Sequence, residues 1–320
     1  KRKEFQDGID TKDYYLSSDI SRNVEQFNLH FPINNRVIQN HDEMTKIWDF
    51  MFNSELHIET KDHPVLMTES PQNEKDAREK TTEIMMEKYS CPAFHMAYPE
   101  TLALYVIGKT TGTVIDIGET MTHVVPVYKS FGMTFTTTSL PIGGRQINHV
   151  LKKRLKSEGI IFSSEQDRDT IRSIKETVCM CGPEGDESPV DYTLPDGTTL
   201  QIPRSAVSSP DVLFHPKYAK VKSKGLPELV TTALGEVDED IKEEVGGTVV
   251  LIGGSSLFPG LKEQLAASLP SANVITTPGR RLQAWLGGSK LASLSTFSQM
   301  LISQAEYNEV GPPIVHLKCF

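Results

Sequence analysis

The sequence predicts an α/β fold in which helices cover both faces of mixed sheets. From residue 31 onward, strand-like and helix-like segments alternate in the order strand, helix, strand, helix, hairpin. Two strand-like runs, 112–128 and 248–260, each carry glycine at a turn. The 320 residues, 38% hydrophobic and 23% charged, are enough for a substantial buried core and for more than one domain.

The first part of the chain shows the alternation most clearly. Residues 1–30 are polar and predict a short mobile lobe of strands and loop. Met44, Ile47, Trp48 and Met51 recur at helical spacing, which indicates one buried helix face. We expect strands at 31–38, 63–70 and 92–96, and helices at 40–56, 73–89 and 100–107.

The run 112–128 predicts a hairpin with chemistry in its turn. Residues 113–117 and 121–127 are β-branched or apolar, and Gly118 lies between them. Such a turn directs backbone N–H groups into an anion site, and Asp116 at the end of a buried strand could hold a metal through water. An ordinary hairpin with one acid in its turn is the alternative.

The run 248–260 predicts a second turn of the same kind. A continuous apolar strand leads to Gly253 and Gly254, with Ser255 or Ser256 as the expected N-cap of a helix at 261–269. Two such turns facing one another would form a cleft. Simple tight-turn chemistry is the alternative for the glycine pair.

The remaining segments continue the α/β pattern. Asp196 and Gly197 favour a two-residue hairpin turn. The basic triplet 152–154 and the acidic stretch 238–244 are typical of solvated helix faces. The apolar, proline-containing tail predicts a docked C-terminus. We expect strands at 134–140, 190–193 and 198–202, helices at 146–155 and 165–177, and a strand with a helix at 281–303.

Composition excludes several classes of protein. A net charge of −9 and a pI near 5.5 argue against direct nucleic-acid binding, so any nuclear role would run through partners. No run of about 18 apolar residues and no secretory signal is present, so we expect no membrane contact and an intracellular location. Four cysteines without C-x-x-C spacing indicate neither a zinc site nor a disulfide framework.

Several motifs, spread over the whole chain, resemble actin. They are Asp116-x-Gly118 with Thr122-His123, Gly253-Gly254-Ser255 with Pro259-Gly260, Trp285-Leu-Gly-Gly288 and the tail 311–320. The resemblance implies the actin-like fold, with two α/β domains around a nucleotide cleft. The first domain would span 1–106, with a small outer lobe at 1–31, and be completed by 283–320. The second would span 107–282, with an insertion lobe at about 143–221.

The resemblance also implies a site for ATP or ADP with Mg. Asp116 would be the catalytic acid that holds the magnesium through water, and His123 would lie near the attacking water. Members of the family begin with a further glycine-rich phosphate turn, which residues 1–30 do not supply. The implied nucleotide-binding residues are Gly118, Glu119, Thr120, Gly144, Lys175, Glu176, Gly253, Gly254, Ser255, Phe258 and Arg281.

Two departures weaken the implied ATPase. Thr120 stands where actin has glycine, which is unfavourable if the backbone needs positive φ. Pro99 stands at the water-orienting glutamine and has no side-chain amide. Losing one positioning group costs roughly 10²-fold or more in rate, so we expect slow or absent hydrolysis. Glu100, which would face differently on its helix, is a poor substitute.

The nucleoside side is better kept. Lys175 and Glu176 match the base-side and ribose-contacting pair, and a surface ion pair is the alternative for them. Phe258 replaces a tyrosine and Arg281 a lysine, changes that retain aromatic character and positive charge.

An apolar groove for partners is also implied. A core-packing stripe is the alternative for Leu291, Leu294 and Met300. A groove of this kind would receive an amphipathic helix from a partner or a neighbouring subunit. The matching positions are Tyr105, Ile107, Gly108, Leu291, Leu294, Thr296 and Met300.

Three functions follow from the resemblance. The first is an actin-related structural subunit that binds adenine nucleotide with little or no hydrolysis in a larger assembly, such as an axonemal, dynein-associated or remodelling complex. The second is a divergent filament-forming actin with ATPase activity, and the third is a monomer-binding regulator. The expected location is the cytoplasm and cytoskeleton, with the cilium or nucleus as further options.

Overall fold

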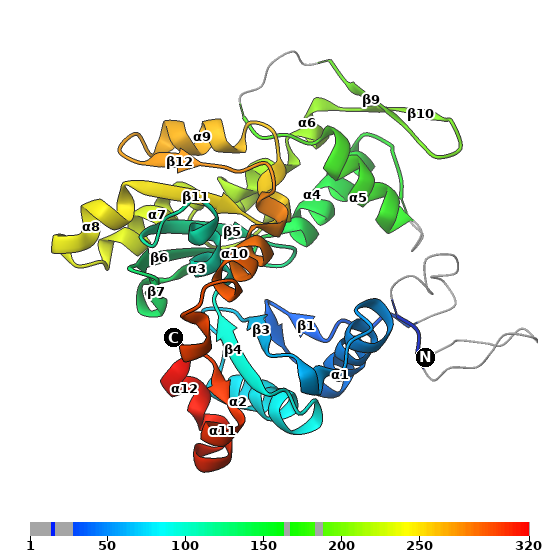
Figure 1. The fold of residues 1–320 in the computed structure, drawn as a ribbon. Coiled ribbons are helices and arrows are strands. Elements are labelled where there is room, and N and C mark those ends of the chain that lie inside the picture. The colour runs from blue at the N-terminus through cyan, green and yellow to red at the C-terminus, as the bar shows by residue number, and fades with distance from the viewer. Residues whose placement is uncertain (1–13, 17–27, 163–166, 183–187, 320) are drawn as a thin grey trace, which may run out of the picture.

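The computed structural model describes residues 14–16, 28–162, 167–182 and 188–319, and most of the outer lobe predicted at 1–31 lies outside these ranges. Two bodies are visible in Figure 1, each built on its own sheet. We call the elements around the three-stranded sheet the small-sheet half and those around the six-stranded sheet the large-sheet half.

The large sheet is mixed and has the order β12-β11-β5-β6-β7, with β8 also paired to β6. β5 and β6 form the predicted antiparallel hairpin, in which Asp116 is directly opposite His123. β11 and β5 run parallel, so their carboxyl ends meet at one edge. The strands are β5 Gly112–Ile117, β6 Thr122–Tyr128, β7 Phe131–Gly132, β8 Thr138–Leu140, β11 Thr248–Ile252 and β12 Asn273–Ile275.

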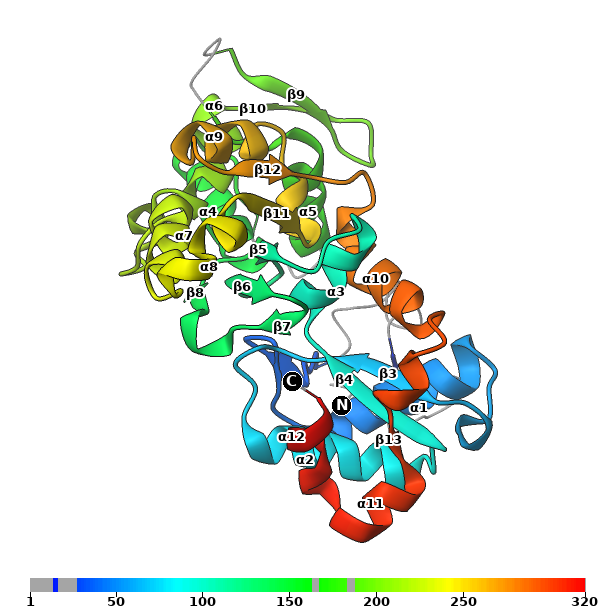
Figure 2. The same cartoon turned by 60° about the vertical axis from the view of Figure 1, so that its left-hand side comes forward.

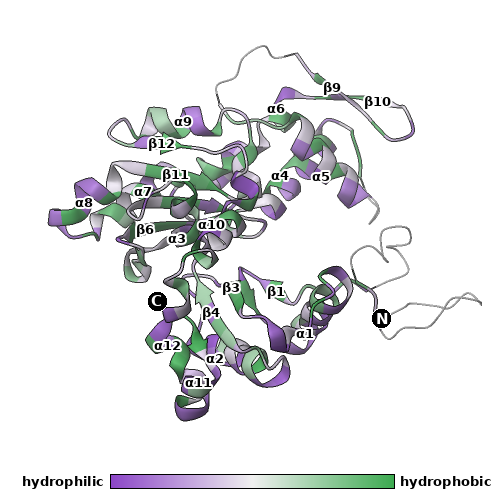
Figure 3. Ribbon diagram, in the orientation of Figure 1, coloured by the Kyte–Doolittle hydropathy of each residue, from purple (hydrophilic) through white to green (hydrophobic). Residues whose placement is uncertain are grey.

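Helices cover both faces of this sheet, as the sequence predicts. Ile115 and Ile117 of β5 face a large core formed with four longer helices and the short helix Arg204–Val207, whereas Val114 faces Ala103 and Leu104 of helix α3 (Pro99–Val106). This alternation is the period-two pattern of a strand buried on both sides. Figure 3 shows hydrophobic colour along β11 and hydrophilic colour on the outer helix α8 (Glu239–Gly246). The four longer helices are α4 Gly144–Ser157, α5 Asp167–Val178, α7 Leu226–Gly235 and α9 Leu261–Ser268.

The small sheet is completed by the end of the chain. β3 (Val65–Thr68) and β4 (Ala93–Ala97) run parallel, and β13 (Ile302–Ser303) pairs antiparallel with β4. Its core joins early residues such as Trp48 and Met85 to Ile302, Tyr307 and Val315. The predicted docked tail is therefore confirmed. The helices of this half are α1 His41–Phe50 and α2 Lys75–Glu83, each continued by a π-helical turn, together with α11 Gln304–Val310 and α12 Val315–Lys318.

α3 and α10 (Gln283–Ala292) lie against each other between the two halves, as Figure 2 shows. Their approach is close because Gly287 has no side chain: an added Cβ would lie 1.8 Å from the carbonyl oxygen of Leu102. Gln283 also donates a hydrogen bond of 2.9 Å to the carbonyl of Ala103. The chain enters the large-sheet half through α3 and leaves it through α10.

Two hairpins lie apart from these sheets. The predicted segment 31–38 is a short hairpin with two residues per strand. The hairpin predicted around Asp196-Gly197 is present next to α4 and α5. The strands are β1 Ile33–Asn34, β2 Val37–Ile38, β9 Val190–Thr193 and β10 Thr199–Ile202, and the short helix α6 Arg204–Val207 follows.

Two local predictions were wrong. Helix α9 has Gly260 as its N-cap, because a 3-10 turn over Gly254–Leu257 separates the glycine pair from the helix. Ser255 and Ser256 therefore do not cap it. Residues 134–136 form a 3-10 turn instead of strand, since Thr136 and Thr137 hydroxyls bond back to the carbonyl of Met133. The four cysteines are free and buried.

Candidate functional site

The two glycine turns predicted from the sequence lie against each other at the carboxyl ends of β5 and β11. Gly253 has a φ of 89°, and a Cβ there would lie 2.5 Å from the Oδ1 atom of Asp116. The hydroxyl of Ser255 donates a 2.9 Å hydrogen bond to the carbonyl of Gly118. Only glycine permits this close approach of backbone to the acid.

A third turn, at the start of α4, joins the first two. The Gly144 amide donates to the Gly118 carbonyl at 3.0 Å, and the Arg145 amide donates to the Glu119 carbonyl at 2.7 Å. A Cβ on Gly143 would lie 2.6 Å from the carbonyl carbon of Glu119. The 118–120 turn is thus fixed from two sides.

Polar groups converge on Gly144 and form what we call the Gly144 cradle. A Cβ on Gly144 would lie 2.5 Å from a Glu119 carboxylate oxygen, 3.0 Å from Lys175 Nζ and 3.0 Å from Ser255 Oγ. Lys175 is 4% exposed, donates to the Gly144 carbonyl at 3.3 Å, and has its pKa lowered by burial. Gly254 borders open space, since an added Cβ would meet nothing within 4 Å. Buried polar donors beside open space suit a polar ligand.

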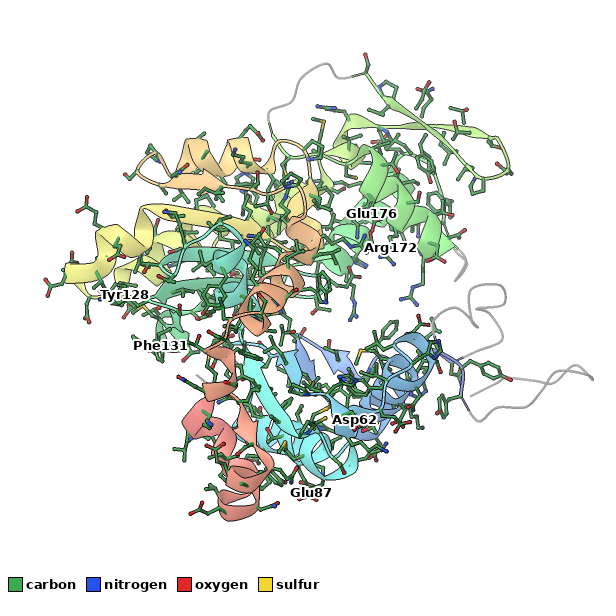
Figure 4. All side chains as sticks on the ribbon, viewed as in Figure 1. Asp62, Glu87, Tyr128, Phe131, Arg172 and Glu176 are labelled. Atoms are coloured by element: carbon green, nitrogen blue, oxygen red, sulfur yellow. The ribbon has the colours of Figure 1, made fainter. Side chains whose placement is uncertain are left out.

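Lys175 and Glu176 do not form a surface ion pair. Lys175 points inward, whereas Glu176 pairs with Arg172 one helical turn away at 3.0 Å, and both side chains are exposed. Figure 4 shows the two labelled residues side by side on α5. The alternative interpretation of a surface pair is therefore wrong, and the structure brings only Lys175 into the cradle.

The other residues predicted to bind nucleotide differ in how far they are buried. Thr120 is buried and does not have positive φ, so its side chain causes no backbone strain there. Phe258 is buried in the core of the large-sheet half, and Arg281 is exposed. The neighbour of Arg281, Arg280, was missed: its guanidinium contacts the carbonyl of Ser256 at 3.2 and 3.3 Å and braces the glycine turn.

A second cluster forms at the other carboxylate oxygen of Asp116, Oδ2. The Arg36 guanidinium contacts the Asp116 carboxylate through Nη2 and the Glu100 carboxylate through Nη1, the latter at 3.4 Å. Glu100 is fully buried behind Pro99, the first residue of α3. Sequence reasoning missed Arg36, which is separated from Asp116 by 80 positions. We call Arg36, Glu100 and Asp116 the Arg36 cluster.

Burial and charge set the protonation of this cluster. Burial raises the pKa of Glu100 to about 7, with Asp116 adding to the effect and Arg36 opposing it. Burial alone would lower the pKa of Arg36, but attraction to Asp116 and Glu100 raises it. His123, 1% exposed, has its pKa lowered to about 4 by burial and then by Arg36, so the imidazole is neutral at pH 7. Its Nδ1 atom has no hydrogen-bond partner among the described residues.

The two implied cofactors fit these residues unequally. The Gly144 cradle offers a buried cation, a hydroxyl and close backbone approach, which suits an adenine nucleotide. Mg²⁺ needs oxygen ligands and water, but the carboxylate of Asp116 is already in contact with a guanidinium. In the described ranges no three His, Cys, Asp or Glu side chains gather to hold a metal. The side chains as placed do not fit magnesium.

The residues of the predicted groove separate into core and surface. Leu291 is 6% exposed and packs with Leu102 and Phe297, so core packing explains it. Leu294 and Met300 are 55% and 37% exposed, so core packing does not explain them. The other positions are half-buried Tyr105 and Ile107 and exposed Gly108 and Thr296.

The family model described as Actin matches residues 2–320. In the part of the chain that the structure describes, no helix has the length and apolar character needed to cross a membrane.

Proposed function

Because this chain belongs to the actin family, we propose that it is an actin-related structural subunit that holds an adenine nucleotide with little or no hydrolysis. The observation that carries the proposal is the contrast between the Gly144 cradle and the residues around Pro99. The Gly144 cradle keeps Lys175 and Ser255 converging beside open space. The position expected to orient water is Pro99, which is buried and has no side-chain amide.

A low rate of ATP hydrolysis follows from this contrast. Bound nucleotide would be held by the cradle and by the turns at Gly118 and Gly253. Hydrolysis also needs a group that aligns water, and Glu100 is turned toward Arg36 instead. His123 is neutral and buried opposite Asp116, so it adds no positive charge for a phosphate.

The proposed setting is a multi-protein assembly in the cytoplasm or cytoskeleton, including a cilium. Its support is the surface around Leu294 and Met300, which keeps exposed apolar side chains next to the buried Leu291. A partner helix with apolar anchors at helical spacing suits such a surface.

Two measurements test the nucleotide proposal. Equilibrium binding of a fluorescent ATP analogue should saturate, and single-turnover assays with labelled ATP should release phosphate at a rate roughly 10²-fold or more below that of a filament-forming actin. A phosphate burst at the actin rate would contradict the proposal. If the chain binds no adenine nucleotide, the Gly144 cradle is not a nucleotide site and the proposal fails.

The second candidate is a filament-forming actin with ATPase activity, in which the exposed Leu294 would serve as an apolar anchor between identical subunits. Light scattering in polymerising salt decides between them. A signal that rises above a critical concentration, with filaments under the electron microscope, would favour this candidate.

A further inference from the structure

Arg36 lies in a left-handed turn conformation that is unfavourable for a residue with a side chain. It follows Asn35 in the β1–β2 turn, and the two residues have φ values of 66° and 47°. A pair of left-handed residues is the type I′ geometry that favours glycine or asparagine, so an arginine there carries a conformational cost. Contacts made by the side chain must outweigh that cost.

The hairpin lies across the two halves. β1 and β2 are close to the small-sheet half in sequence, but Arg36 reaches Asp116 on β5 of the large sheet. Phe31, just before the hairpin, contacts the guanidinium groups of Arg145 and Arg168 at 5.6 and 5.8 Å from its ring centroid. Both contacts join residues 31–36 to the large-sheet half.

The guanidinium is enclosed by the groups that it neutralises. The side chain of Arg36 is 17% exposed, that of Asp116 is 8% exposed and that of Glu100 is 0% exposed. A buried carboxylate pair needs a cation or a proton, since two negative charges repel strongly in a low dielectric. Arg36 supplies a full positive charge that does not dissociate at any working pH.

We propose that Arg36 is a built-in cation that replaces a divalent metal at Asp116, so that this site takes up no Mg²⁺. A metal entering the site would have to displace a guanidinium with charged partners or sit beside it against electrostatic repulsion. The fork of the guanidinium satisfies both carboxylates in a fixed geometry, whereas Mg²⁺ retains several waters that need space. We expect Mg²⁺ to be excluded from Asp116 both in the nucleotide-free protein and in a nucleotide complex.

The test is calorimetric titration of the full chain, free of nucleotide, with MnCl₂ and MgCl₂. The natural chain should show no saturable heat at millimolar metal. Arg36→Gln frees the carboxylates and should bind Mn²⁺ at least tenfold more tightly, and adding Asp116→Asn should remove that gain. Lys242→Gln is the matched control, because it also removes one cation from a carboxylate partner, Glu239, but on the exposed helix α8. It should behave as the natural chain does.

Folding is checked by circular dichroism and thermal unfolding. Since Arg36→Gln leaves two carboxylates facing each other, Arg36→Gln with Glu100→Gln provides a variant with one acid left, and it should show the same gain. Tight Mn²⁺ binding by the natural chain, or no gain in either folded variant, would overturn the proposal.

Nucleotide binding measured with and without Mg²⁺ distinguishes failure of this inference from failure of the proposed function. Affinity for the fluorescent ATP analogue should agree within twofold in EDTA and in excess Mg²⁺. If the analogue does not bind at all, the proposed function fails, while the metal titration still decides the role of Arg36. If Mg²⁺ tightens binding tenfold or more, the inference fails and the proposed function stands.

Discussion

His95 and His123 show how burial sets the chemistry of single residues in this protein. His95 lies on β4 with its Nδ1 atom 3.4 Å from the thiol of Cys319, and His123 lies on β6 beside the Arg36 cluster. Burial lowers the pKa of both to about 4. Both imidazoles are therefore neutral in the folded chain at pH values where an unfolded chain would protonate them.

This difference predicts a loss of stability in mild acid. The folded pKa values lie below the unfolded value of 6.5, so the unfolded chain binds more protons between pH 6.5 and about 4. The free energy of unfolding should therefore fall as the pH drops through that window. At pH 5 the loss should be roughly 1 to 2 kcal/mol per histidine. Urea titrations from pH 7.5 to 5 measure it. His95→Gln should have a shallower slope, and an unchanged slope would exclude His95 as a source.

A second prediction concerns Lys175. Lys175→Met keeps the length of the side chain but removes the charge at the Gly144 cradle. Affinity for the ATP analogue should fall roughly 10-fold or more, the scale of a charged hydrogen bond. Thermal stability should not fall, because a buried charge is removed together with its desolvation cost. Lys153→Met on the exposed face of α4 is the control and should leave affinity unchanged.

Single residues also mark where sequence reasoning reached its limit. Pro99 was recognisable because its missing amide is a property of the residue itself. Arg36 was not, since its role depends on a contact 80 positions away and on a turn whose backbone no pattern specified. The sequence also did not distinguish Lys175 from Glu176: adjacent helical residues point about 100° apart, and only Lys175 is buried.

Elements were easier to predict than their junctions. The strands around 112–128 and 248–252 were predictable because they are continuous apolar runs, and helix 40–56 because of its apolar stripe. Two-residue β13 has no such signal and exists only because β4 offers it a partner. The start of α9 was misplaced because Ser255 and Ser256 lie inside the 3-10 turn, where their hydroxyls donate to the carbonyls of Gly118 and Gly253.

The contact between α3 and α10 gives an element-scale prediction. Gly287→Ala places a methyl group 1.8 Å from the Leu102 carbonyl oxygen, so the helices must separate. We expect a loss of about 2 kcal/mol or more in the free energy of unfolding. Gly235→Ala is the control, since an added Cβ near the end of α7 meets nothing within 4 Å and improves helix propensity. Chemical denaturation of both variants should show opposite signs.

At the scale of the molecule, the surface around Leu294 should hold a partner helix. Leu294→Glu exposes no core, since the side chain is 55% exposed, so the fold should remain intact. In a pull-down from the native assembly, partner recovery should fall at least tenfold, because a charge at the centre of an apolar contact is costly. Ile161→Glu, a matching change at a 68% exposed residue in the large-sheet half, is the control. Unchanged recovery with a folded Leu294→Glu chain would show that the partner docks elsewhere.

The return of the chain to its starting half also sets the order in which the protein can mature during synthesis. The core of the small-sheet half needs Ile302, Tyr307, Ile314 and Val315, which a ribosome makes about 200 residues after β4. At roughly 5–20 residues per second, Trp48, Met85 and Phe94 wait about 10 to 50 seconds for their last neighbours. Through that interval the nascent chain carries an unfinished apolar surface and an unpaired edge on β4. Its yield in a cell therefore depends on what shields that surface before translation ends.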